Sequence, residues 1–271
     1  MRIIDTHSHV FPDFLAERAM KTLSEHSGAY KPFLNGTIAD LVKSMDKNKI
    51  KSSFIANIAT KPEQSEASLK WSQKVRSERI IPLGSIHPSS LNWEIELENI
   101  KSEGLPGIKL HPLYQNFLID DKRIYPVYEK VAELGLFILF HSGYDIAFGK
   151  RDDALSFRMK KIVERFKNLK IIAAHLGGWR EWDNVLENLA GKDVFFETSF
   201  INEVPQKTLE AVLSKHDKNR FFFGSDSPWL SQESQIDFIK KLNISDDFKE
   251  GIFYKNLEQS GLLTSISTES E

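Results

Sequence analysis

The feature of this chain that most constrains its fold is a repeated alternation of short apolar runs with amphipathic helical patterns. The runs are rich in Ile, Phe and Leu without strict polar alternation, which is typical of strands buried on both faces. Eight runs occur, at Arg2–Thr6, Ser53–Ile58, Ile80–Ile86, Gly107–Leu110, Leu136–Phe140, Lys170–Ala174, Val194–Glu197 and Arg220–Phe223. Helical spacing is clearest over Ile38–Asn48, Asn92–Lys101, Asp121–Leu134, Ala154–Phe166, Thr208–Lys215 and Gln232–Leu242.

A strand followed by a helix, repeated eight times, predicts an α/β fold of the (β/α)8 TIM-barrel type. An open doubly wound sheet uses the same alternation, but the count of eight and the length of 271 residues favour the closed barrel. We expect a single domain over residues 1–263 and a polar tail over residues 264–271. The segment Val10–Thr37 is inserted after the first strand, where it would form a lid or pocket wall.

Composition excludes several classes of protein. The chain has no cysteine, so disulfides, cysteine-based zinc sites, iron–sulfur clusters and thiol nucleophiles are excluded. The net charge is −2 with no basic run, so no nucleic-acid partner is expected. The N-terminus carries a charge pair instead of an apolar run, and no apolar stretch approaches about 18 residues. We therefore expect no signal peptide, no membrane association and a cytoplasmic location.

The first strand ends in a motif that can bind metal. Side chains alternate along a strand, so Asp5, His7 and His9 share one face. Two imidazoles two positions apart can chelate one metal ion. The alternative is a pair of polar residues where a strand meets solvent.

Ionisable side chains also follow five other predicted strands: Lys109 with His111, then His141, His175, Glu197 and Asp226. In a barrel the C-terminal ends of the strands converge on one mouth, so these residues become neighbours. A buried His or Asp directly after an apolar strand is costly unless it is paired or bound. Packing explains one such residue but not a set on five strands, so the pattern predicts a functional site.

Together these motifs resemble the amidohydrolase superfamily, in particular the amidohydrolase-related branch that includes aminocarboxymuconate-semialdehyde-decarboxylase-like enzymes. The resemblance runs from the opening Asp-x-His-x-His, through Gly-Ile-Lys-Leu-His-Pro, His-Ser-Gly, Ala-His-Leu-Gly-Gly and Gly-Ser-Asp-Ser-Pro, to Tyr-Lys-Asn-Leu at 254–257. It implies that the metal ligands are His7, His9, His141 and Asp226. It also implies that His175 binds a second metal in two-metal members, or acts on water or substrate in one-metal members.

The implied ligand set makes chemical sense. Three imidazoles and one carboxylate leave a position open for water, as in catalytic sites. A divalent ion would make that water acidic enough to supply hydroxide near neutral pH, and Asp226 or His175 would take its proton. Zn²⁺ fits best, with Mn²⁺ or Co²⁺ as alternatives.

Lys109 bears on the number of ions. Some relatives carry a carboxylated Lys at this position that bridges two metals, whereas an uncarboxylated Lys109 would be a cation suited to a substrate carboxylate. The branch favours one ion and leaves two as the alternative. We also assign His111, a second polar group on the same strand face, to substrate binding. Arg180 and Trp229 are assigned there too, although loop packing would account for each of these two equally well. A related nuclease branch carries Glu at the Lys109 position, which disfavours nuclease activity.

The sequence thus predicts a metal-dependent hydrolase that acts on a small carbonyl compound, such as an amide, a lactone or a cyclic amide. One alternative is a metal-dependent non-oxidative decarboxylase on the same site. Another is a non-catalytic barrel that uses its metal for binding or stability. The expected partner is a small molecule, and the resemblance allows a homodimer. Outside the site, His216 follows the helix expected over Thr208–Lys215, where a cation suits the helix C-terminus.

Overall fold

The computed structural model describes residues 2–263, so the expected tail over residues 264–271 lies outside the described residues. Its eight strands are β1 (Ile4–Ser8), β2 (Ser52–Ile55), β3 (Ile80–Pro82), β4 (Gly107–Leu110), β5 (Phe137–Phe140), β6 (Lys170–Ala173), β7 (Phe195–Glu197) and β8 (Phe221–Phe222). All pair in parallel, as β1-β2-β3 and as β4 through β8.

Hydrogen bonds at two junctions join these groups into a closed barrel. Between β3 and β4, the Lys109 amide donates to the Gly84 oxygen at 2.9 Å. Between β8 and β1, the Thr6 amide donates to the Phe223 oxygen at 2.8 Å. The predicted TIM barrel is therefore confirmed.

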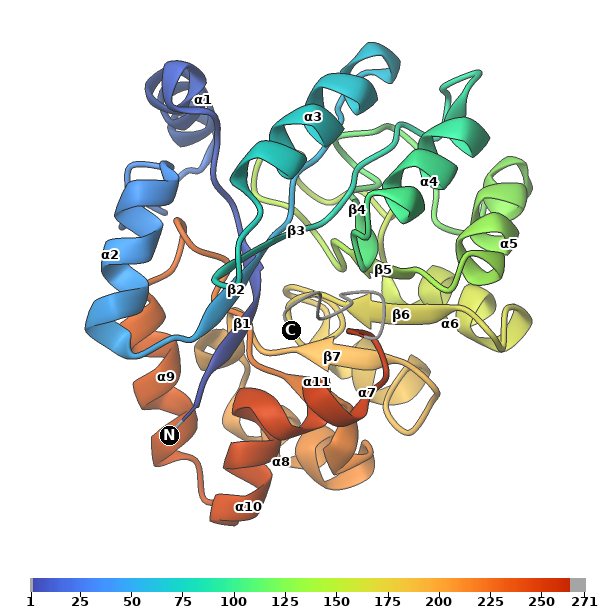
Figure 1. Cartoon of the computed structure of the whole chain (residues 1–271). Coiled ribbons are helices and arrows are strands. Elements are labelled where there is room, and N and C mark those ends of the chain that lie inside the picture. The colour runs from blue at the N-terminus through green and yellow to red at the C-terminus, as the bar shows by residue number, and fades with distance from the viewer. Residues whose placement is uncertain (1, 264–271) are drawn as a thin grey trace, which may run out of the picture.

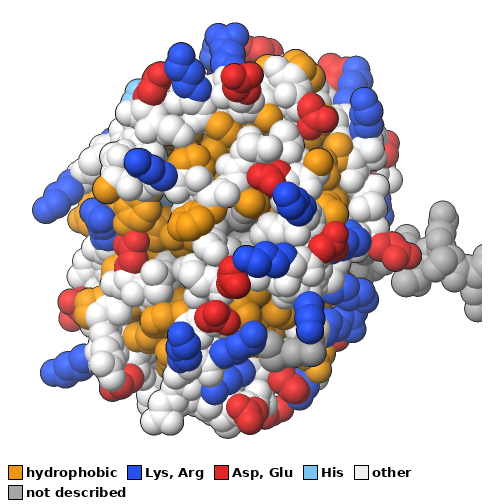
Figure 2. Space-filling model, turned by 90° about the vertical axis from the view of Figure 1, so that its left-hand side faces the viewer, with side chains coloured by type: hydrophobic (Ala, Val, Ile, Leu, Met, Phe, Trp, Pro, Cys, Tyr) orange, Lys and Arg blue, Asp and Glu red, His pale blue; other side chains and the backbone are white. Residues whose placement is uncertain are grey.

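Helices surround the ring of strands (Figure 1). They are α1 (Asp13–His26), α2 (Ile38–Asn48), α3 (Ser65–Val75), α4 (Trp93–Ser102), α5 (Tyr125–Glu133), α6 (Ser156–Arg165), α7 (Trp182–Asn188), α8 (Gln206–Lys215), α9 (Gln232–Lys241), α10 (Asp246–Glu250) and α11 (Asn256–Gln259). Within residues 2–263, every helix is too short or too polar to cross a lipid bilayer. Positive and negative side chains are interspersed over the face shown in Figure 2.

Most strands are rich in apolar residues because both of their faces are buried, and β1, with the sequence Ile-Asp-Thr-His-Ser, is buried but mostly polar. Along β5, Phe137 and Leu139 belong to the barrel interior, whereas Ile138 and Phe140 belong to the core between strands and helices. This alternation follows from the two-residue period of a strand. The interior also contains Ile4, Phe54, Leu83, Ile172 and Phe222, together with Leu257 and Leu262 from the C-terminal region. Truncating one of these buried Phe side chains to Ala would cost about 3–5 kcal/mol.

The inserted segment after β1 forms α1 and a loop. Its ends are anchored by main-chain bonds, from the Phe11 amide to the Gly36 oxygen at 2.8 Å and from the Phe33 amide to the Pro228 oxygen at 2.7 Å. Phe14 and Leu15 of α1 line the cavity at the barrel mouth. The insertion therefore forms a wall of this cavity.

Candidate active site

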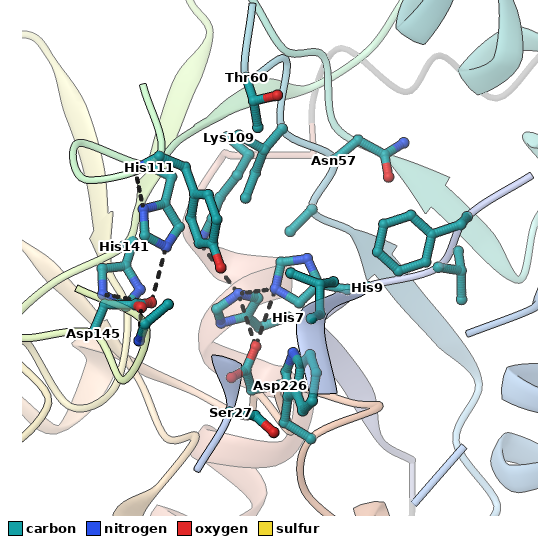
Figure 3. Close-up of a pocket in the computed structure, with 18 of the residues that line it drawn as sticks. His7, His9, Ser27, Asn57, Thr60, Lys109, His111, His141, Asp145 and Asp226 are labelled. Atoms are coloured by element: carbon teal, nitrogen blue, oxygen red, sulfur yellow. Dashed lines mark hydrogen bonds and ion pairs between the residues drawn. The ribbon is translucent and has the colours of Figure 1, made fainter. Parts of the chain in front are cut away.

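A cavity of about 570 Å³ opens at the C-terminal ends of the strands. Polar side chains from the strand ends lie together in it (Figure 3). Its apolar walls include the aromatic residues Phe11, Phe14, Tyr30, Trp71, Tyr114, Trp179, Phe200 and Trp229. An apolar pocket with a few converging polar groups is the usual form of a small-molecule site.

Three of the predicted metal ligands converge. The Nε2 atoms of His7 and His9 are 3.1 Å apart, and Oδ1 of Asp226 lies 3.4 Å from the first and 3.1 Å from the second. His7 and His9 meet because they alternate along β1 and its extension. Asp226 reaches them from the loop after β8 with a φ of 53°. The three side chains lie together in Figure 3.

The hydrogen bonds of His7 show that this cluster suits a cation. Nδ1 of His7 lies 2.9 Å from Oε1 of the buried Glu197, which fixes the ring proton on Nδ1. Nε2 therefore directs a lone pair toward the carboxylate of Asp226 and the ring of His9. Burial, followed by the charge of Lys109, lowers the pKa of His7 well below its usual value, so the ring is neutral. Neutral imidazole held by a carboxylate, beside a second imidazole and an aspartate, is a donor set for Zn²⁺ or a similar ion.

His141, the fourth predicted ligand, adjoins His175. Its Nδ1 lies 3.1 Å from Nε2 of His175, and its Nε2 lies 3.0 Å from the Tyr144 oxygen. The ligand atoms of His7, His9 and Asp226 lie within 4.8 Å of one another, and His141 instead forms such a group with His111 and Asp145. The structure thus brings three of the four predicted ligands together directly, and the role of His141 stays a prediction.

In the group of His111, His141 and Asp145, three of the four ring nitrogens face a matching protein donor or acceptor, and Nδ1 of His141 faces Nε2 of His175. The Tyr114 amide donates to Nδ1 of His111, so the ring proton lies on Nε2, which faces Oδ2 of Asp145 at 3.4 Å. Nε2 of His141 faces the Tyr144 oxygen, which accepts its proton. The two rings stack with centroids 4.0 Å apart. These contacts leave less need for an ion here than at His7.

Lys109 lies at the centre of the site. It is 1% exposed, and its Nζ is 3.2 Å from Nε2 of His7. Burial lowers the pKa of Lys109 to about 8, although the charges of Asp226 and Glu197 favour its protonated form. The uncarboxylated state of Lys109, which accompanies a single ion, stays a prediction.

The predicted substrate-binding residues divide into two sets. Lys109, His111 and Trp229 line the cavity. Arg180 is exposed and is not among the described residues that line it. Its guanidinium stacks on Trp179 at 4.2 Å and donates to the Tyr30 hydroxyl at 3.3 Å.

Sequence reasoning placed Glu197 at a strand end but assigned it no role. It is fully buried and contacts His7, His175 and Ser199. The available signal was a carboxylate directly after Phe195 and Phe196 on a buried strand. Asp5 shares a strand face with His7, yet its carboxylate accepts from Ser225 and Gln232, and burial raises its pKa to about 6.

The amidohydrolase family model matches residues 4–257. A dihydroorotase of Vibrio vulnificus (strain CMCP6) is 24% identical over 153 residues, which is 51% of this chain and 45% of that protein. The chain thus matches less than half the length of this curated relative.

Solved structures share the fold over nearly the whole chain. An uncharacterized TIM-barrel protein from Bordetella bronchiseptica has a TM-score of 0.77 at 16% identity, covering 98% of this chain and 99% of that one. A putative 2-pyrone-4,6-dicarboxylic acid hydrolase from Pseudomonas putida has a TM-score of 0.65 at 16% identity, covering 99% and 98%. A 5-carboxyvanillate decarboxylase mutant from Novosphingobium aromaticivorans, with bound manganese, has a TM-score of 0.66 at 12% identity, covering 95% and 96%.

Proposed function

The chain belongs to the amidohydrolase family, and on that premise we propose that it is a metal-dependent hydrolase of a small carbonyl compound. The substrate class is an amide, a lactone or a cyclic amide. The proposal is supported by a cluster of two imidazoles and one carboxylate at the base of a largely apolar cavity.

His7, His9 and Asp226 would hold the ion, with His141 as a further ligand implied by the family resemblance. Zn²⁺ suits these donors best, and Mn²⁺ or Co²⁺ are the alternatives. When bound, a divalent ion lowers the pKa of a coordinated water to about 7 and polarises a carbonyl oxygen. We propose one ion per chain.

Asp226 is the favoured proton carrier. Its carboxylate lines the cavity, and it can accept a proton from the attacking water and return it to the leaving group. His175 is the other candidate, but both of its ring nitrogens already have partners, Ser199 Oγ at 2.7 Å and His141 Nδ1 at 3.1 Å. The contacts therefore favour Asp226 for proton transfer.

The charges of the residues that line the cavity favour hydrolysis of a neutral substrate over decarboxylation of an anionic one. Among the described residues that line it, Lys109 is the only Lys or Arg, and two carboxylates, Asp145 and Asp226, line it as well. Recognition of a carboxylate commonly uses the bidentate fork of an Arg, and no Arg is among the described residues that line this cavity. Because Lys109 already faces His7, the cavity suits a neutral carbonyl group better than an anion.

A metal-dependent decarboxylase is the second candidate, and the buried cation of Lys109 favours it. The test is to incubate metal-loaded protein with amides and lactones and, separately, with unsaturated carboxylic acids. Hydrolysis of the neutral compounds is the expected result. Release of carbon dioxide from the acids without hydrolysis would establish the decarboxylase instead. A protein that binds metal but converts neither set would point to the non-catalytic barrel.

A further inference from the structure

One buried carboxylate contacts two histidine-bearing strands of the site. Glu197, at the end of β7, reaches the ring of His7 and the main chain of His175. We propose that Glu197 is a positioning residue that fixes the ring protons of His7 and His175 on Nδ1, so that both Nε2 lone pairs point to the metal-binding side of the site, toward Lys109 and His141. The inference rests on the proposed function only in taking His7 as a metal ligand.

Every polar contact of the Glu197 carboxylate is with a donor. Oε1 lies 2.9 Å from His7 Nδ1, 2.7 Å from the His175 amide and 2.7 Å from the Ser199 hydroxyl. Oε2 accepts from the Ser199 amide at 2.8 Å. This arrangement suits an acceptor without a proton of its own, so the proton between Glu197 and His7 belongs to the imidazole.

The same reasoning extends to His175 through Ser199. A serine hydroxyl has a single hydrogen, and here that hydrogen is donated to Glu197. The Ser199 oxygen can therefore only accept from Nδ1 of His175, 2.7 Å away. His175 must carry its proton on Nδ1, which leaves Nε2 as a lone pair.

The surrounding backbone is shaped to hold this carboxylate. His175 has a φ of 59°, in the left-handed region that non-glycine residues rarely adopt, and its amide donates to Glu197. Gly224 leaves the space that Glu197 occupies, because a Cβ at this position would lie 2.0 Å from Oε2. The loop after β6 thus supplies a hydrogen-bond donor to the Glu197 carboxylate, and the loop after β8 leaves space for it.

Two carboxylates compete for the ring proton of His7, and Lys109, whose Nζ lies 3.2 Å from Nε2, opposes a proton on Nε2. Glu197 is 2.9 Å from Nδ1, and Asp226 is 3.4 Å from Nε2. Glu197→Gln replaces the nearer carboxylate with a neutral amide, so the proton should move toward Nε2. We expect nitrogen NMR of the metal-free variant to show protonated Nε2 on His7. Competition with a chelator should show about a 10- to 100-fold loss of Zn²⁺ affinity.

Glu181→Gln is the matched control. Glu181 is also a buried glutamate, but it accepts from the amide and hydroxyl of Ser156 rather than from a histidine ring. This variant should keep the wild-type Zn²⁺ affinity and the Nδ1–H form of His7. Equal losses in both variants, or wild-type values in Glu197→Gln, would overturn the proposal.

Two further measurements decide the matter if Glu197→Gln does not fold. In metal-free wild-type protein, His7 and His175 should both be protonated on Nδ1, and Nε2 protonation of His7 would overturn the proposal. Ser199→Ala removes the acceptor of the His175 Nδ1 proton, so His175 should no longer be protonated mainly on Nδ1. His7 should keep its proton on Nδ1. An unchanged His175 would refute the relay through Ser199. None of these readouts needs turnover, so they stand apart from a failure of the proposed hydrolase activity.

Discussion

The main-chain amide of Asp226 donates to the main-chain oxygen of His7 at 2.8 Å. This main-chain bond, together with the Ser225 contacts of Asp5, sets the loop after β8 against β1. The φ of Asp226, 53°, lies in the left-handed region that non-glycine residues rarely adopt. The carboxylate is therefore held beside the two histidines before any ligand arrives.

Asp226→Asn should abolish most turnover while leaving part of the metal binding. The amide keeps the shape and one oxygen donor but cannot accept the proton of the attacking water. Because proton transfer by a positioned side chain contributes about 10²–10⁴-fold, we expect a loss of kcat of that order. Steady-state kinetics and metal analysis of the same preparation measure both effects. Asp237→Asn on α9 is the control, and undiminished turnover in Asp226→Asn would remove this residue from the mechanism.

His7→Ala should remove metal and activity together, because it deletes the ring that faces both His9 and Asp226. Metal content after dialysis, measured beside activity, tests this. His26→Ala is the comparison for metal content, since His26 lies at the cavity wall on α1 and its Nδ1 contacts the Thr22 oxygen. Full metal occupancy in His7→Ala would show that the ligand assignment is wrong.

Metal analysis should find one ion per chain, both in wild-type protein and in Lys109→Met. The Lys109 ammonium lies 3.2 Å from His7 Nε2 and occupies space that a second cation would need. Lys47→Met, on the surface of α2, controls for the loss of one lysine. Two ions in the wild type and one in Lys109→Met would instead indicate a carboxylated, bridging lysine.

Acid should destabilise the protein through His216. Burial lowers the pKa of His216 to about 4 from its usual 6.5, so the unfolded chain binds the proton more tightly. Stability from this group is complete above pH 6.5 and is lost as pH falls toward 4. Between pH 7 and pH 5 the free energy of unfolding should drop by about 2 kcal/mol from this group.

Urea unfolding at the two pH values, for wild type and His216→Gln, measures this effect. The variant should lose less stability on acidification than the wild type. Equal losses would show that His216 does not titrate between the folded and unfolded states.

The surroundings of His216 differ from those that the sequence indicated. Its position after α8 suggested a cation at a helix C-terminus, but the ring is 3% exposed and stacks on Phe196 at 4.2 Å. The Gly191 amide donates to Nδ1, and Nε2 lies 3.0 Å from the Val194 oxygen, so the neutral ring is satisfied. These partners belong to β7 and to the segment between α7 and β7, about 20 residues earlier in the chain, so the sequence around His216 does not predict them.

The barrel could be predicted because strands buried on both faces leave short apolar runs in the sequence, and eight such runs recur along the chain. Strand ends were less predictable: β2 ends at Ile55 rather than Ile58, where the chain turns into the cavity wall. Helix α3 was missed because its sequence, Ser65–Val75, is largely polar and only Ser65 and Ser72 are buried.

The site could be predicted down to its residue types but not its pairings. The period of β1 indicated that His7 and His9 share a face, the family resemblance implied Asp226 as a ligand beside them, and the structure places all three together. Asp226 faces the cavity, whereas Glu197 contacts Nδ1 of His7 on the side away from the cavity. No sequence pattern distinguishes these two placements of a carboxylate. Arg180 also follows a strand end and was expected to bind substrate, but its guanidinium stacks on Trp179.

The hydrogen bond between Thr6 and Phe223 joins residues 217 positions apart. During synthesis, the first strand therefore leaves the ribosome long before the strand that completes its pairing. Contacts of such sequence separation form late and slowly. A nascent chain interrupted anywhere before β8 would present His7 and His9 without Asp226, so chelation by this trio must wait for almost the last stage of translation.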